Sequence, residues 1–354
     1  MQVTQKQIAA YVGVDQAAVS RALSGTGRLI GLSDTRVAEI RQAAAKLGYL
    51  PNASARGMRA GKFGTIALVL SAHMGRSYLP ERTLSGICDA LGERDLHLTI
   101  ARLPDEKLTD AGFVPKILRE YCCDGMLIDY TDDIPAKMID LIEHLRQPAI
   151  WLNRKRDHDC VYPDDMAIGR MATRRLLEAG HRRIAYVDWG AGWKQLDDAH
   201  YSQRDRQAGY VEAMKAAGLA PRPIRREDRD NEAQAKRLCE TVTHLLAEDD
   251  RPTAFVAYAD QFARRAAAAA LRQGLRVPED LSLVTVAASE METLDDDTRL
   301  SAVMAPERKY GTAGVEALLE KLAAPGGTRL APRAVPPTKF FEGQTVAPPP
   351  RPAE

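Results

Sequence analysis

Hydrophobic residues recur at helical spacing in three short stretches near the N-terminal end of the chain. The first stretch begins with a capping-box pattern at Thr4 and stops at Gly13, and the second follows Asp15, whose carboxylate can cap a helix. The third begins at Ser33 and stops at Gly48. The apolar positions of the three stretches are Ile8, Ala9, Val12, Ala18, Val19, Ala22, Leu23, Val37, Ile40, Ala44 and Leu47. This pattern predicts an all-α head of three short helices.

From Gly64 onward the pattern changes, because apolar runs of strand length alternate with amphipathic helical stretches. The predicted strands are residues 65–70, 97–103, 125–130, 149–153, 183–188, 253–258, 282–287 and 301–305. The helical stretches between them include residues 82–93, 166–179, 203–217 and 260–273. Such alternation is typical of parallel sheets covered by helices, and these strands are too many for one comfortable doubly wound sheet. The body is therefore predicted to consist of two α/β lobes.

The charge is distributed unevenly between the head and the body. Residues 1–62 hold nine Lys or Arg against three acids, a net charge of +6, whereas the whole chain carries only +1. A small basic head on a slightly acidic body favours nucleic acid as the partner of the head.

Several motifs make the chain similar to a known family. They are Ile8-Ala9-x-x-x-Gly13-Val14, Val19-Ser20-Arg21-Ala22-Leu23, Leu47-Gly48-Tyr49-x-Pro51-Asn52 with Ala55, and Gly180-His181-Arg182-Arg183-Ile184-Ala185. On these residues the chain resembles the lactose-repressor/galactose-repressor (LacI/GalR) family of transcription regulators, over nearly its whole length. The resemblance implies a helix-turn-helix DNA-binding head, a hinge helix that folds in the minor groove, and a body with the periplasmic-binding-protein type I fold. It also implies a small-molecule effector between the two lobes.

The second predicted helix is the expected recognition helix, and its exposed positions suit a major groove. Gln16 can pair with an adenine edge, Ala17 can touch a thymine methyl group, and Arg21 can fork onto guanine O6 and N7. Ser20 and Arg28 are expected to meet phosphate.

The family motifs add further expected DNA contacts in the head and the hinge. These are Thr4, Asn52 and Ala55, together with Met58, which stands where the family usually has a leucine wedge between base pairs. Since Gly57 weakens an isolated helix, the hinge is expected to become helical only on DNA.

Ligands of doubly wound sheets bind beyond the carboxyl ends of the strands, which singles out a set of candidate effector contacts. They are His73, Tyr78, Asn153, Asp164, Trp189, Trp193, Ser202, Arg206 and Asp260. Ser202 and Arg206 match the family's effector-contacting serine and arginine, and Asp260 could instead cap a helix. The effector could be a sugar or a sugar derivative. However, Ala259, Ala287 and Ala288 stand where the family usually has polar side chains for sugar hydroxyls.

The predicted domains are a helix-turn-helix domain over residues 1–50, a hinge and linker over 51–62, and an effector-binding and dimerisation domain over 63–345. The proline-rich residues 346–354 are expected to be disordered. No leucine heptads follow the body, so a homodimer on palindromic double-stranded operator DNA is the simplest assembly.

Three other functions compete with that of an effector-controlled regulator. An enzyme is disfavoured, since the loop Gly190-Ala191-Gly192 lacks the third glycine of a dinucleotide site and the cysteines lack metal-ligand spacing, so neither a cofactor nor a metal is expected. A sugar-transport protein would need a signal peptide, which the first residues do not resemble, and a cytoplasmic protein without a membrane span is expected. A regulator whose body only dimerises or docks a protein remains the alternative.

Overall fold

The computed structural model describes residues 3–25, 31–50, 61–73, 76–104, 114–120, 122–131, 134, 136–144, 147–188, 200–224 and 240–350. The chain divides into two compact units, Met1–Phe63 and Gly64–Glu354. The division falls one residue from the end of the linker predicted from the sequence.

The head consists of the three predicted helices: α1 (Gln5–Val12), α2 (Gln16–Leu23) and α3 (Asp34–Lys46). Each begins at the expected capping residue, since the side chains of Thr4, Asp15 and Ser33 accept hydrogen bonds from backbone N–H groups of the first turn. Gly13 ends α1 in the left-handed conformation, with φ of 69°. The buried centre of the head is formed by Ile8, Ala9, Val19, Ala22, Ile40, Ala43 and Ala44.

The first lobe of the body contains a six-stranded sheet in the order β11-β5-β4-β3-β1-β2. All its strand pairs are parallel. Its strands are β1 (Thr65–Ser71), β2 (His97–Leu103), β3 (Gly125–Asp129), β4 (Ala149–Leu152), β5 (Cys160–Pro163) and β11 (Arg333–Val335). Its helices are α5 (Glu81–Gly92), α6 (Lys116–Arg119), α7 (Ala136–His144) and α12 (Glu307–Ala323).

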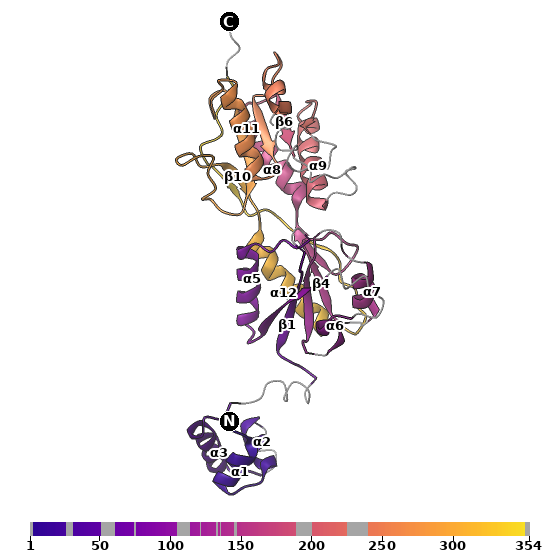
Figure 1. Ribbon diagram of the computed structural model, residues 1–354, viewed down its shortest axis with the longest axis vertical. Helices are drawn as coiled ribbons and strands as arrows, with labels where there is room; N and C mark the ends of the chain where they lie inside the picture. Colours follow the sequence, from indigo (N-terminus) through magenta and orange to yellow (C-terminus); the bar gives the residue numbers. More distant parts are fainter. Residues whose placement is uncertain are drawn as a thin grey trace. The chain divides into compact units, whose positions relative to one another are not determined.

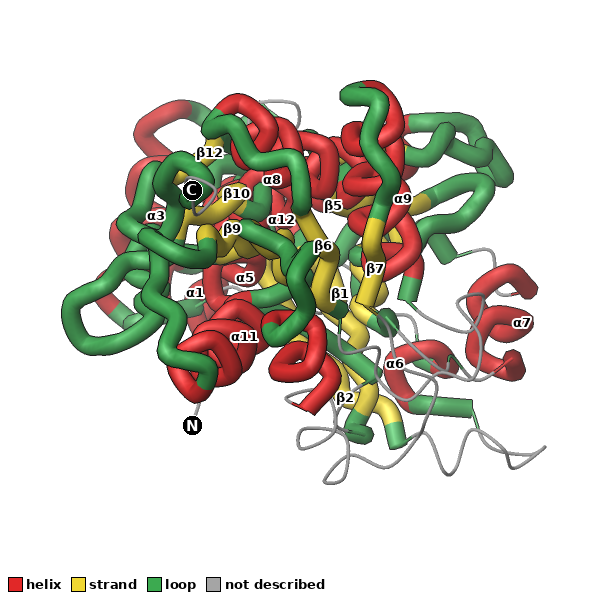
Figure 2. Tube along the Cα trace, turned by 90° about the horizontal axis from the view of Figure 1, so that it is seen from above, coloured by secondary structure: helices red, strands yellow, loops and turns green. Residues whose placement is uncertain are grey.

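The second lobe repeats this arrangement with the strand order β12-β10-β9-β8-β6-β7, in which the neighbours β6 and β7 lie side by side (Figure 2). Its strands are β6 (Ile184–Val187), β7 (Arg222–Ile224), β8 (Ala254–Ala257), β9 (Ser282–Ala287), β10 (Ser301–Met304) and the antiparallel β12 (Phe340–Phe341). Its helices include α8 (Asp165–Glu178), α9 (Tyr201–Ala216) and α11 (Asp260–Arg272).

The chain crosses between the lobes three times. The first crossing follows β5 and leads into α8, the second follows β10 and leads into α12, and the third lies between β11 and β12. In Figure 1, α12 lies beside α5 in the first lobe, although it follows a strand of the second. The predicted two-lobed α/β body is thus confirmed, and both crossover helices begin between the two sheets.

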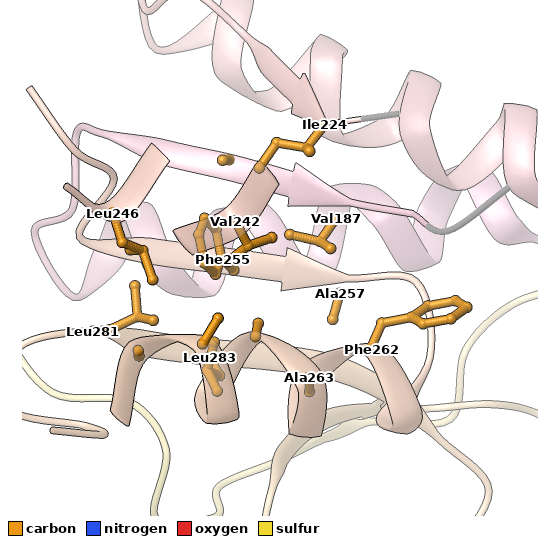
Figure 3. Close-up of a cluster of buried hydrophobic side chains, with 14 of the residues drawn as sticks. Val187, Ile224, Val242, Leu246, Phe255, Ala257, Phe262, Ala263, Leu281 and Leu283 are labelled. Atoms are coloured by element: carbon orange, nitrogen blue, oxygen red, sulfur yellow. The ribbon is translucent and has the colours of Figure 1, made fainter. Parts of the chain in front are cut away.

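Apolar side chains from strands and helices fill each lobe on both faces of its sheet. In the second lobe, Val187 and Phe255 come from neighbouring strands and pack against Leu283 and against Ala263 of α11 (Figure 3). Since these side chains are buried, they hold β6, β8 and β9 together and so fix where the carboxyl ends of these strands lie. The candidate ligand residues follow those ends.

The C-terminal segment corrects one expectation, because residues 346–350 are ordered rather than disordered. Ala347 O accepts from Ser282 Oγ at 3.0 Å and lies 2.8 Å from His181 Nε2, and Val346 packs on the core of the second lobe. The proline content suggested no packing partner, but the buried His181 and Ser282 provide one. Residues 351–354 lie outside the described residues.

Within the described part of the chain, no helix is long and apolar enough to span a bilayer. The same residues contain no group of three or more His, Cys, Asp or Glu side chains placed to hold a metal ion.

Candidate nucleic-acid interface and ligand site

Helix α2 presents one buried and one exposed face. Ala18, Val19 and Ala22 are buried in the head, whereas Gln16, Ala17 and Arg21 are exposed and Ser20 is half-buried. The Asp15 carboxylate accepts from Ala18 N at 2.6 Å and ties down the helix start. The side chains predicted to read bases therefore share the solvent face of a capped helix.

Other polar groups of the head support its own structure. Thr4 N donates to Gln7 Oε1 at 2.8 Å, and Gln7 N donates back to Thr4 Oγ1 at 3.4 Å. Arg36 donates to the carbonyl of Val12 at 3.0 Å, which fixes α3 against the end of α1. The structure therefore assigns Thr4 a capping role.

Arg206, in α9 of the second lobe, is held by two partners, Asp165 of α8 and Tyr258, which follows β8. Its Nε donates to Asp165 Oδ1, and its Nη1 donates to the Tyr258 carbonyl at 2.7 Å. Only 15% of the Arg206 side chain and 1% of that of Asp165 are exposed. Burial alone would lower the pKa of Arg206, but the Asp165 carboxylate outweighs this and raises it. Arg206 is thus a charged member of a buried ion pair.

A chain of hydrogen bonds runs from Arg206's neighbour Tyr258 to the first lobe. Ser202 Oγ lies 2.7 Å from Tyr258 OH and 2.8 Å from His200 Nδ1. His200 Nε2 lies 2.8 Å from the carbonyl oxygen of Asn153, which follows β4 of the first lobe with φ of 52°. Tyr201 OH donates to Asn153 Oδ1 at 3.2 Å. These contacts join the two lobes at Asn153.

The protonation state of His200 follows from this environment. Burial lowers its pKa to about 4, because the site disfavours the imidazolium form more than the Asn153 carbonyl favours it. At neutral pH one ring nitrogen donates and the other accepts, so His200 can serve both Asn153 O and Ser202 Oγ.

Glycines bring the paired helices of each lobe unusually close. A Cβ on Gly169 of α8 would lie 2.0 Å from the carbonyl oxygen of Arg206, and a Cβ on Gly209 of α9 would lie 2.1 Å from that of Met166. The close crossing places Asp165, at the start of α8, against the Arg206 side chain.

The first lobe contributes a second set of polar groups at the carboxyl end of β3. Asp129 is 0% exposed, and its carboxylate forms no ion pair with a described Lys or Arg. Burial raises its pKa well above the ordinary value, although the Tyr78 N–H favours the charged form. Glu307, at the start of α12, is also buried, and burial raises its pKa more than Arg82 lowers it. Both acids are close enough to Tyr310 to raise its pKa.

A hollow of about 470 Å³ lies elsewhere, over α8 and β12. Its lining includes Arg170, Arg174, Arg175 and Phe340, and none of the predicted ligand contacts. We place the candidate ligand site at the interlobe contacts rather than in this hollow, because the buried charges and the carboxyl ends of the strands converge there.

The chain is similar in sequence and in structure to several known proteins. Residues 173–346 match the model of the periplasmic binding protein-like domain. The probable HTH-type transcriptional repressor ExuR of Bacillus subtilis is 26% identical, over 91% of this chain and 92% of that protein. The HTH-type transcriptional repressor CytR of Escherichia coli is 27% identical, over 90% and 89%. The crystal structure of the Lac repressor dimer superposes with a TM-score of 0.74 at 19% identity, covering 98% of this chain and all of that one.

These comparisons support a transcription regulator of the LacI/GalR family. Its relatives are transcriptional repressors rather than enzymes. Among the described residues, the contacts around Arg206 are the candidate ligand site and the exposed face of α2 is the candidate nucleic-acid interface.

The structure brings together some of the predicted ligand residues and assigns others a structural contact. Ser202 and Arg206 both reach Tyr258, and Asn153 joins them through His200. Asp164 caps α8 by accepting from Ala167 N at 2.9 Å. Asp260 does not cap α11, since it pairs with Arg264 at 2.5 Å.

Tyr78 and His73 are exposed in the first lobe. The electrostatic influence of Arg206, Tyr258 and Asp260 on the Tyr78 hydroxyl places this ring at the interlobe site. Six predicted contacts lie outside the described residues: Arg28, Asn52, Ala55, Met58, Trp189 and Trp193.

Sequence reasoning missed Asp165, His200, Tyr258, Asp129 and Glu307. Asp165 follows the predicted Asp164 in the sequence. From the sequence alone, an acid at a helix start that caps the helix cannot be told from one that forms an ion pair with a distant arginine. Asp129 ends the apolar run of β3. An ionisable residue at the carboxyl end of a buried strand is a signal that could have identified it as a candidate site residue.

Proposed function

We propose that the protein is a sequence-specific DNA-binding regulator, acting as a homodimer whose operator affinity depends on a small molecule bound between the lobes. The exposed face of α2 carries the proposal. Gln16, Ala17 and Arg21 lie together on a helix whose other face is buried, which leaves them available to base edges. We also propose a cytoplasmic location and a role without catalytic activity.

The comparisons support the partners that we propose. The similar solved structures include the Lac repressor dimer bound to operator and the anti-inducer ONPF, and a complex of the transcriptional regulator CelR with cellobiose. We infer operator DNA and a small-molecule effector for this chain, with sugars among the candidates, and we place the effector at the contacts of Ser202, Arg206, Asn153 and Tyr78.

The DNA-binding proposal is tested with duplexes selected by the full-length protein from random sequence. Wild-type protein should bind a palindromic selected duplex more tightly than a scrambled one, with affinity that falls as salt rises. Arg21→Ala should lose about 1 to 3 kcal/mol per half-site and relax the preference at one base pair. Arg21→Lys is the matched control, since it keeps the charge without the planar fork and should recover only the nonspecific part of the affinity.

Two results would contradict this function. Equal affinity for selected and scrambled duplexes would exclude specific binding. If Arg21→Ala weakened binding to all duplexes equally, Arg21 would contact phosphate instead of a base. The dimer is tested by analytical ultracentrifugation, which measures the mass of the protein alone and of its operator complex. A complex that contains one protein chain per duplex would exclude the dimer.

A further inference from the structure

The hollow of about 470 Å³ in the second lobe lies on the solvent side of α8. Its wall is formed by six side chains from one stripe of α8 and by Phe340 of β12. The opposite stripe of α8, which includes Ile168 and Ala172, is buried in the core of the lobe. The volume of the hollow falls within the range of about 300 to 1,000 Å³ that is typical of small-molecule sites. The interlobe contacts do not line it, so it is a separate cavity.

The lining of the hollow is basic. It contains three arginines, Arg170, Arg174 and Arg175, against a single acid, Glu178. Arg170 and Arg174 are four residues apart on a helix, so their side chains are neighbours on the same face. Since the cations outnumber the acid, an anion is the ligand whose charge this lining matches.

Two of the arginines are held in place by acids that lie outside the lining. Arg170 Nη1 donates to both carboxylate oxygens of Glu212 on α9, at 3.2 and 3.4 Å. Arg175 Nε and Nη2 donate to the two oxygens of Glu342 at 2.8 and 3.0 Å, and the guanidinium carbon lies 5.7 Å from the centre of the Phe340 ring. The four charged side chains are 31% to 60% exposed, so these pairs contribute little stability. They do orient the two guanidinium groups before a ligand arrives.

Arg174 is the cation of this hollow that has no counter-ion among the described residues. It is exposed, and no hydrogen bond or ion pair joins it to another described side chain, although Glu178 follows it by one helical turn. Nη2 of Arg170 and Nη1 of Arg175 also have no acceptor among the described residues. The hollow therefore offers donors from three guanidinium groups to one ligand.

We propose that the hollow is a second ligand site, which binds a small organic phosphate through Arg174 and the remaining donors of Arg170 and Arg175. A phosphate monoester carries about −1.5 to −2 charges at pH 7 and three acceptor oxygens, and guanidinium groups match its geometry. Met171 and Phe340 supply the apolar part of the lining, against which the organic group of the ligand packs. The site differs in place and in chemistry from the interlobe contacts, where the effector is proposed to bind.

The test is titration calorimetry on the full-length protein at pH 7.5, in a buffer free of phosphate, with phenyl phosphate as the probe. Phenol and inorganic phosphate are the matched control ligands, because the first lacks the charge and the second lacks the apolar group. Phenyl phosphate should bind saturably and about tenfold or more tightly than either control. Its affinity should fall as salt is added, since the arginines are exposed to solvent.

The variant Arg174→Gln removes the guanidinium group and keeps a long polar side chain. It should weaken phenyl phosphate binding about tenfold or more. Arg272→Gln is the matched control, since Arg272 is an exposed arginine of α11 in the same lobe, and it should leave the affinity unchanged. Arg170→Gln is a second variant at the hollow and should also weaken binding.

No binding of phenyl phosphate, equal affinity for either control ligand, or unchanged affinity in folded Arg174→Gln and Arg170→Gln would overturn the inference. If Arg21→Ala abolished phenyl phosphate binding while Arg174→Gln did not, the anion would bind at the basic head and the hollow would be excluded. Equal affinity of the wild type for selected and scrambled duplexes would contradict the proposed function and leave the phosphate site standing.

Discussion

The Arg206 guanidinium lies over the ring of Tyr258, with 4.4 Å between its central carbon and the ring centroid. The same arginine donates to the carbonyl oxygen of Tyr258 at 2.7 Å. Stacking and hydrogen bonding to one residue fix the direction of the guanidinium, and Asp165 balances its charge. Arg206 therefore supports the structure of the second lobe as well as being a candidate ligand contact.

Replacement of Arg206 by alanine should destabilise the fold, because it leaves the Asp165 carboxylate buried without its counter-ion. We expect a loss of about 3 to 5 kcal/mol in the free energy of unfolding, measured by urea denaturation at pH 7. Adding Asp165→Asn to Arg206→Ala should recover part of the loss. The exposed Arg174→Ala is the control and should stay within about 0.5 kcal/mol of wild type. An equally small change for Arg206→Ala would show that the pair is not a structural support.

The buried His200 should make stability fall on mild acidification. Its pKa in the folded protein is about 4, below the ordinary 6.5, so its contribution is fully present above pH 6.5 and is lost as the pH falls toward 4. Over that interval the loss amounts to about 3 kcal/mol, at about 1.4 kcal/mol per pH unit. His200→Gln cannot titrate and should show a shallower decline in unfolding free energy between pH 6.5 and 4.

The exposed His144→Gln is the control for this experiment and should follow the wild-type pH profile. Identical profiles for wild type and His200→Gln would mean that the pKa of His200 is the same in the folded and unfolded protein. The hydrogen bonds from His200 to Asn153 and Ser202 would then have to be reassigned.

Gly169→Ala should separate α8 from α9. The added Cβ would lie 2.0 Å from the carbonyl oxygen of Arg206, and backbone must move to accommodate it. Overpacking of this kind destabilises by about 1 to 3 kcal/mol, measured by chemical denaturation. Gly92→Ala is the matched control, since Gly92 is also helical and nothing lies within 4 Å of its Cβ position, and it should stabilise by about 0.5 to 1 kcal/mol. Equal behaviour of the two variants would contradict a tight α8–α9 crossing.

The elements that sequence reasoning predicted correctly carry local signals. The helix caps at Thr4, Asp15 and Ser33 each join residues three apart, and the runs that became β1, β3 and β9 are largely apolar and buried. The short strands β5, β7, β11 and β12 were missed, because two to four residues hold too little periodicity and their pairing depends on distant partners.

By itself the sequence determined the three-helix head, the two-lobed α/β body, the resemblance to the LacI/GalR family and the solvent-exposed face of α2, since all of these depend on spacing within short segments or on shared motifs. Only the tertiary structure decided the ion pair of Asp165 with Arg206, 41 residues apart, and the link from His200 to Asn153, 47 residues apart. The physical reason is that the pKa and partners of a polar group depend on what burial and the crossing of the chain place beside it, which no local pattern records.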